Sequence, residues 1–210
     1  ERNLFGRGQQ VRLNTSLSFK KQQVDFSFTE PYFMGMPIAA GIDLFATNTD
    51  YSEYSSYESK QIGGALRTGF DLDEYSSLDF KYYLAYRRTT GIDHSVAAPA
   101  IIAQEGSNWK SSVGATYTWD DLDDPSIPTT GLRAQLDGEI AGLGGDARYG
   151  RLEAHAWYFY PIYEESVILK LEGNAGHIQS FGGRDVPLQD RFFEGADSFR
   201  GFASAGVGPH

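Results

Sequence analysis

The chain has 210 residues, no cysteine and a formal net charge of −10, a balance that argues against a nucleic-acid partner because phosphate binding needs clustered Lys and Arg. No apolar run is long enough for a transmembrane helix. A mean hydropathy of −0.40 does not exclude a membrane, since the strands of a membrane barrel alternate between lipid-facing and water-facing side chains, and the 24 glycines, 13 tyrosines and 14 phenylalanines favour an all-β fold.

Nine segments show the period-two alternation that places every second side chain on the same face of a strand. Between residues 78 and 87, for example, Leu78, Phe80 and Leu84 alternate with Asp79 and Lys81. The sequence therefore predicts an all-β fold built from antiparallel strands. In chain order the predicted strands are 9–20, 24–29, 38–47, 61–70, 78–87, 109–119, 132–140, 151–160 and 167–175.

Both a soluble β-sandwich and a transmembrane β-barrel produce strands with one apolar and one polar face. Many of the predicted strands approach or exceed about ten residues, the length that a tilted strand needs to cross a bilayer. Aromatic residues gather at strand ends, as in 158–163, where a membrane interface would lie. These two features predict an antiparallel transmembrane β-barrel, with Leu13, Leu84 and Leu169 facing lipid.

The connections between the predicted strands differ in length in the way expected of outer-membrane barrels, with short turns on one side and long loops on the other. The compact connections are 31–37, 72–77 and 161–166, and the longer ones are 48–59 and 89–107. The tight turn at 20–22 departs from this pattern because it lies on the side of the long loops.

The polar face of the predicted barrel contains charged residues that need water around them. In the strand 132–140, for example, Arg133, Asp137 and Glu139 share one face. We expect this face to line a hydrated lumen. The residues predicted to face the lumen are Arg12, Arg67, Arg133, Asp137, Glu139, Glu153, Lys170 and Glu172.

After residue 177 the alternation stops, and 178–210 is predicted to be a long extracellular loop. This loop contains Phe199, Arg200, Gly201 and Phe202, preceded by Gly195 and Asp197. The segment resembles the (V/I)-R-G-(F/Y) signature of the BamA outer-membrane assembly family, with Phe199 in place of the usual β-branched residue. Three further segments resemble the family in the same order: NLFGRGQ (3–9), TEPYF (29–33) and DPSIPTTGLR (124–133).

The resemblance implies that residues 1–210 form part of a C-terminal outer-membrane barrel domain of sixteen strands, of which this chain holds about nine. It implies that the motif loop folds back into the lumen, that Arg200 binds acceptors on later strands, and that Gly195 and Asp197 support the loop. An Arg suits this role because its planar guanidinium donates several hydrogen bonds to carboxylates.

By the same resemblance, the function is the non-catalytic assembly and insertion of β-barrel proteins in the bacterial outer membrane, without a cofactor. The implied partners are outer-membrane lipids, unfolded β-barrel substrates and the lipoproteins of the BAM complex, reached through periplasmic domains outside this sequence. A two-partner secretion or translocation-assembly transporter carries the same loop motif and stays an alternative.

A passive porin or an enzymatic barrel is a weaker alternative, because the sequence shows no constellation that would activate a nucleophile. No metal site is predicted either. The histidines lack the spacing of metal ligands. The carboxylates Asp120, Asp121, Asp123 and Asp124 lack the Gly and the distal Glu of an EF-hand loop, so they are interpreted as solvated turn residues.

Overall fold

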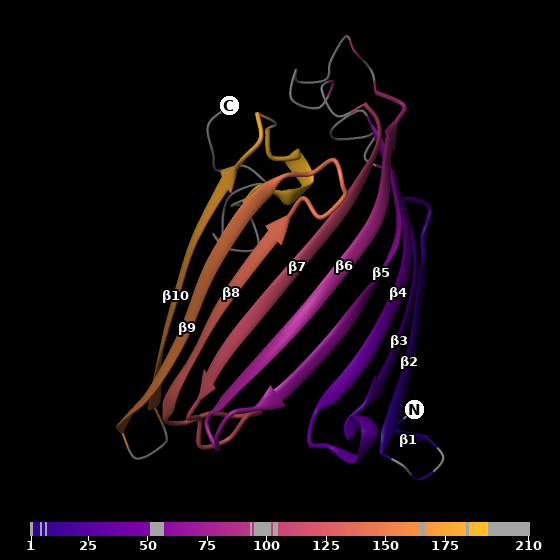
Figure 1. Cartoon of the computed structure of the whole chain (residues 1–210). Helices are drawn as coiled ribbons and strands as arrows, with labels where there is room; N and C mark the ends of the chain where they lie inside the picture. Colours follow the sequence, from indigo (N-terminus) through magenta and orange to yellow (C-terminus); the bar gives the residue numbers. More distant parts are fainter. Residues whose placement is uncertain are drawn as a thin grey trace.

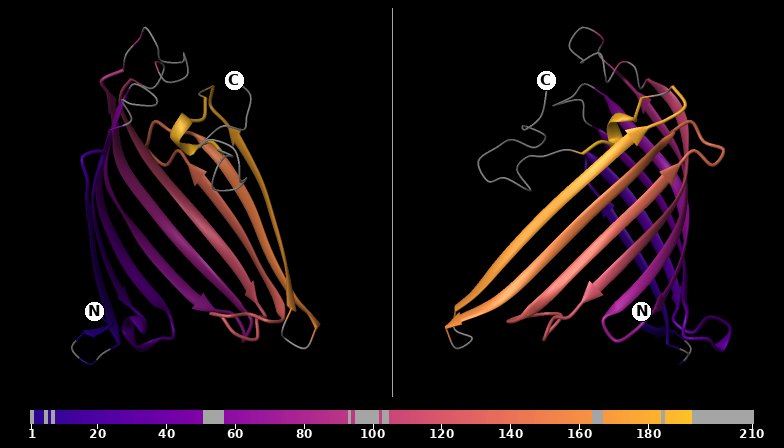
Figure 2. Two further views of the ribbon diagram at one scale, coloured as in Figure 1. Left: turned by 180° about the vertical axis from the view of Figure 1, so that it is seen from behind. Right: turned by 60° about the vertical axis from the view of Figure 1, so that its left-hand side comes forward.

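The computed structural model describes residues 2–4, 6, 8–50, 57–92, 94, 102, 105–163, 167–183 and 185–192. They form a single antiparallel sheet in which each strand pairs with the next strand of the chain. The sheet is twisted and curved but open (Figures 1 and 2). Its strands are β1 (Arg2–Leu4), β2 (Gln9–Leu17), β3 (Lys21–Glu30), β4 (Ala39–Asp50), β5 (Glu58–Asp71), β6 (Ser76–Thr90), β7 (Gly106–Asp120), β8 (Gly131–Ala141), β9 (Tyr149–Tyr163) and β10 (Val167–Ser180), with short 3-10 helices η1 (Phe33–Gly35) and η2 (Leu188–Asp190).

All nine predicted strands are present, as β2 to β10, and the prediction of an all-β fold of antiparallel strands is confirmed. The short strand β1 was not predicted, because three residues are too few to show a period. No helix in the described ranges is long and apolar enough to cross a membrane.

The ends of the strands differ from the predictions where backbone pairing or a turn decides them. β2 ends at Leu17 rather than at residue 20, because Ser18 N–H donates to the Lys21 carbonyl (2.8 Å) and Lys21 N–H donates to Ser18 Oγ (2.9 Å). At the other end of the sheet, β10 continues to Ser180 because Ile178, Gln179 and Ser180 still pair with β9. Residues 178–180, predicted as the beginning of the loop, therefore belong to the strand.

The two faces of the sheet have inverted exposure compared with a soluble domain. Residues paired directly across antiparallel strands project to the same face, and the apolar face is open: Leu13 is 65% exposed, and Leu84 and Leu169 are each 39% exposed. By contrast, the polar-face residues Arg87 and Lys110 are each 6% exposed. In the part of the chain that is described there is no second sheet to cover the apolar residues. This arrangement excludes a β-sandwich of the described strands.

The polar face is the concave face of the sheet. The segment that carries η2 lies within the curve of the sheet (Figure 2), and its Asp190 contacts polar-face residues of β6 and β7. On this face Arg67 on β5 reaches across β4 to Ser27 on β3, at 3.2 Å, over Gly41, where an added Cβ would lie 2.9 Å from the guanidinium. We call this surface the inner face.

The carboxylate of Asp123 forms hydrogen bonds within the turn between β7 and β8. Asp123 accepts hydrogen bonds from the N–H groups of Thr129 (2.9 Å) and Thr130 (3.1 Å) and from the Thr129 hydroxyl. These bonds lower the pKa of Asp123 to about 2. Gly131 ends the turn at φ +115°, where an added Cβ would lie 2.1 Å from the Asp121 carbonyl. The turn is thus organised by its own side chains, and no group of three or more potential metal-binding side chains occurs among the described residues.

Candidate functional site

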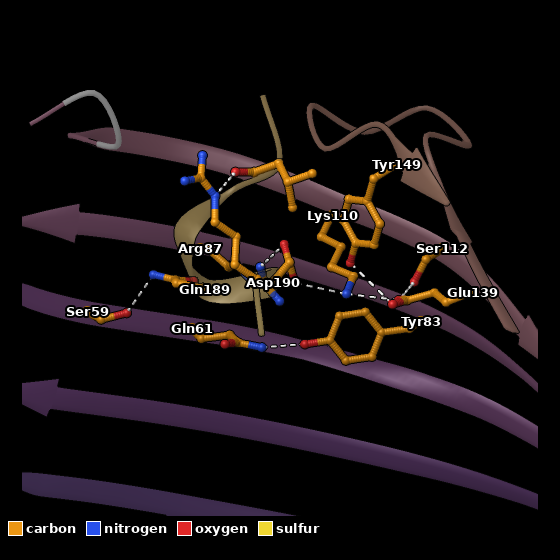
Figure 3. Close-up of polar contacts among 12 residues, drawn as sticks. Ser59, Gln61, Tyr83, Arg87, Lys110, Ser112, Glu139, Tyr149, Gln189 and Asp190 are labelled. Carbon is orange, nitrogen blue, oxygen red and sulfur yellow. Dashed lines mark hydrogen bonds and ion pairs between the residues drawn. The ribbon is translucent and has the colours of Figure 1, made fainter. Parts of the chain in front are cut away.

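Four charged side chains meet on the inner face, close to the end of the sheet where η2 lies. They come from four different elements: Arg87 from β6, Lys110 from β7, Glu139 from β8 and Asp190 from η2. Period-two alternation directs the three strand residues to the same face. We call these four residues the inner-face charge cluster (Figure 3).

The cluster is a continuous chain of ion pairs. Arg87 Nη1 lies 2.8 Å from Asp190 Oδ2, and Lys110 Nζ lies 3.0 Å from Asp190 Oδ1. Lys110 Nζ also lies 2.8 Å from Glu139 Oε1. Two cations and two carboxylates therefore alternate, and each carboxylate has at least one cationic partner.

Hydroxyl groups and aromatic rings complete the surroundings of the cluster. Ser112 Oγ donates to Glu139 Oε1 at 2.7 Å, and the Tyr149 hydroxyl donates to Glu139 Oε2 at 3.2 Å. The Lys110 ammonium lies 5.3 Å from the centroid of the Tyr83 ring and 5.2 Å from that of the Tyr149 ring, within the range of a cation–π contact. Both carboxylate oxygens of Glu139 therefore accept a hydrogen bond from a hydroxyl group, and the Lys110 ammonium lies against two aromatic rings.

Burial makes the pairing necessary. The side chains of Arg87 and Lys110 are each 8% exposed, and that of Asp190 is 3% exposed. A charge withdrawn from water at such a site is costly unless an opposite charge and hydrogen bonds replace its hydration. The cluster therefore determines where Asp190 binds on the inner face. The position of Asp190 in turn fixes where the segment 185–192 docks. Gln189 adds a contact to β5 by donating to Ser59 Oγ at 3.3 Å (Figure 3).

The protonation of Asp190 follows from these contacts and predicts how docking of the segment 185–192 depends on pH. Burial alone would raise the pKa of the Asp190 carboxyl, but the charges of Arg87 and Lys110 outweigh burial and lower it. A carboxyl whose pKa is lower in the docked state stabilises docking above its free pKa and loses this contribution as the pH falls through the docked pKa. We expect constant docking from about pH 8 to about pH 5 and weakening below about pH 4.

Hydrogen exchange of the amides in 185–192, corrected for the intrinsic rate at each pH, measures this dependence. The variant Asp190→Asn is the control, since an amide cannot titrate and should remove the acid transition. A midpoint near pH 6.5 would contradict the prediction and indicate a histidine instead.

The sequence-predicted residues lie in different places. The predicted loop residues Gly195, Asp197, Phe199, Arg200, Gly201 and Phe202 lie outside the described residues. The eight strand residues share the inner face with the cluster, but only Glu139 belongs to it. Of the others, Arg67 donates to Asp43 Oδ1 (3.0 Å), Arg133 lies 3.6 Å from Asp120, Asp137 accepts from Thr116 (2.6 Å), Glu153 pairs with Arg151, Lys170 lies 3.0 Å from Glu172, and Arg12 stands opposite Ser27 in the register.

Three members of the cluster, Arg87, Lys110 and Asp190, were not predicted from the sequence. Arg87 and Lys110 occupy polar positions of predicted strands, so the alternation was a usable signal for their face although not for their partner. Asp190 follows no periodic pattern, and its contacts to Lys110 and Arg87 span 80 and 103 residues of sequence. No local signal connects residues so far apart.

A curved antiparallel sheet with an exposed apolar outer face and a charged inner face defines part of the wall of a membrane β-barrel. The model of the Omp85 superfamily domain matches residues 3–210. The chain therefore belongs to the Omp85 superfamily and is part of an outer-membrane protein, as the resemblance of its motifs predicted.

Relatives with known names agree with this assignment. The chain is 24% identical to the outer membrane protein assembly factor BamA of Neorickettsia risticii over 100% of this chain and 28% of the relative, and 29% identical to that of Nitratidesulfovibrio vulgaris over 100% and 26%. It is 33% identical to a SAM50-like protein of Schizosaccharomyces pombe over 60% of this chain and 27% of that protein. The chain thus spans about a quarter of the length of these relatives.

A solved structure shows the same fold. The crystal structure of BamA from Haemophilus ducreyi lacking POTRA domains 1–3 matches with a TM-score of 0.84 and 23% identity, over 100% of this chain and 43% of that chain. The open sheet accordingly corresponds to a portion of a larger barrel.

Proposed function

We propose that this chain is part of the wall of a protein that assembles and inserts β-barrel proteins into the bacterial outer membrane. The observation that carries the proposal is the position of Asp190, whose ion pairs hold the segment 185–192 on the inner face. This segment precedes the motif loop in the chain. A loop held in this way stays inside the barrel and can support the wall while the remainder of the barrel works on a substrate. The names of the bacterial relatives support the same process.

The proposal gives the two faces different partners. The apolar outer face contacts outer-membrane lipids, and the inner face, including the eight predicted lumen residues, surrounds water. From the resemblance of the motif Phe199–Phe202, we propose that Arg200 binds acceptors on later strands and that Gly195 and Asp197 support the loop. Unfolded β-barrel proteins are the substrates, and accessory lipoproteins of the BAM complex bind outside the residues described. The role is mechanical rather than enzymatic.

Depletion of the full-length protein tests this function. We expect the amounts of folded outer-membrane barrels to fall together, because one machine serves many substrates, while lipoprotein levels stay unchanged. Re-expression of the wild-type protein should restore the barrels. Normal barrel levels with the loss of one secreted protein would contradict the proposal and indicate a two-partner secretion transporter, and a change in channel conductance alone would indicate a porin.

A further inference from the structure

Gly176 occupies an inner-face position of β10 where the Phe192 ring fills the space that a side chain would take. Its partner in the register is Glu153 on β9, which belongs to the inner face. A Cβ atom added at Gly176 would lie 2.6 Å from Cζ and 2.9 Å from Cε1 of Phe192. Real Cβ atoms do not approach a ring so closely, so the aromatic ring lies directly on the glycine backbone.

The other neighbour of Phe192 is a cation. The Arg151 guanidinium carbon lies 5.4 Å from the centroid of the Phe192 ring, a distance typical of a cation–π contact. Arg151 is itself oriented by an ion pair with Glu153. The Phe192 ring therefore packs against the Gly176 backbone and against the Arg151 guanidinium. We call this pair of contacts the seat of Phe192.

We propose that Phe192 in this seat is a second positioning contact for the loop, separate from the inner-face charge cluster. Asp190 and Phe192 are two residues apart in the chain, yet Asp190 binds β6 and β7 whereas Phe192 binds β9 and β10. The segment therefore connects the pair β6–β7 with the pair β9–β10, which are separated in the sheet by β8. Two contacts of different chemistry fix its direction as well as its position, and Gly176 is the residue that makes the second contact possible.

The biological meaning of this seat rests on the proposed function, but its existence does not, because docking can be measured on the purified barrel. The readout is hydrogen exchange of the amides in 185–192 in the full-length protein in detergent micelles. We expect Gly176→Val to accelerate exchange roughly tenfold, because the valine side chain must displace the ring. Valine favours strands, so the strand itself does not suffer.

Gly173→Val is the matched control. Gly173 lies on the same strand, pairs with Ala156 on the outer face and has nothing within 4 Å of an added Cβ. We expect wild-type exchange from this variant. Equal exchange in the two valine variants would overturn the proposal.

Phe192→Ala keeps the proposal falsifiable if Gly176→Val fails to fold, since it changes the loop and not the wall. It should accelerate exchange by a similar factor, and the conservative variant Phe192→Tyr should retain most of the protection. In the double variant Gly176→Val/Phe192→Ala the valine should have no further effect, because the ring that it displaces is gone. Fully additive effects would overturn the proposal. If the variants lose protection of 185–192 in the purified protein but assemble barrels normally in cells, the contact between Phe192 and Gly176 is established. Its role in the proposed function is then contradicted.

Discussion

Replacing Asp190 with alanine should weaken docking of the segment 185–192 by about 3 kcal/mol, because breaking a buried ion pair leaves an uncompensated charge. Arg87 would lose its carboxylate partner at a site where its side chain is 8% exposed. Lys110 would suffer less, since Glu139 remains 2.8 Å from its ammonium. Hydrogen exchange of the segment in the full-length protein should accelerate on the order of a hundredfold, as each 1.4 kcal/mol is about a factor of ten.

Two comparisons separate this effect from a general loss of negative charge. Asp185→Ala removes an exposed carboxylate from the same segment and should leave exchange unchanged. Combining Asp190→Ala with Arg87→Met removes both partners, so the double variant should be less impaired than the sum of the single variants. A wild-type exchange rate in Asp190→Ala, or equal effects of the two Asp variants, would show that the cluster does not hold the segment.

Replacing Leu136 with arginine should destabilise the folded barrel by about 2–4 kcal/mol, the cost of a cation on the lipid face near the middle of a bilayer. Leu136 lies in the middle of β8 on the outer face and is 45% exposed. Its register partners, Tyr117 on β7 and Ala154 on β9, share that face. Denaturant unfolding of the full-length protein in lipid vesicles measures the loss.

Gln135→Arg is the matched control for Leu136→Arg, because it places the same cation one residue earlier on the inner face. Gln135 already donates to Asp137 at 2.9 Å, so an arginine there meets both water and a carboxylate. We expect a change within about 0.5 kcal/mol. If both arginine variants were equally unstable, or if Leu136→Arg were neutral, the outer face would not be in contact with lipid.

The amino-acid sequence by itself determined the class of fold. Alternation is a property of consecutive residues, so β2 to β10 and the separation of apolar from polar side chains could be predicted, and the ordered motifs predicted the superfamily. Local hydrogen bonds set the ends of the strands, as at Ser18, and these were predicted less well.

Only the tertiary structure decided which side chains meet across the curve of the wall. The contacts of Asp190 with Arg87 and Lys110, and of Phe192 with Gly176, join residues brought together by sheet register and curvature, neither of which is encoded in a local pattern. A strand's sequence indicates which face a residue occupies because the face depends on parity alone. The sequence of a strand does not indicate which other segment contacts that face. The segment 185–192, for example, is positioned by side chains of β6, β7, β9 and β10, which are distant in the sequence.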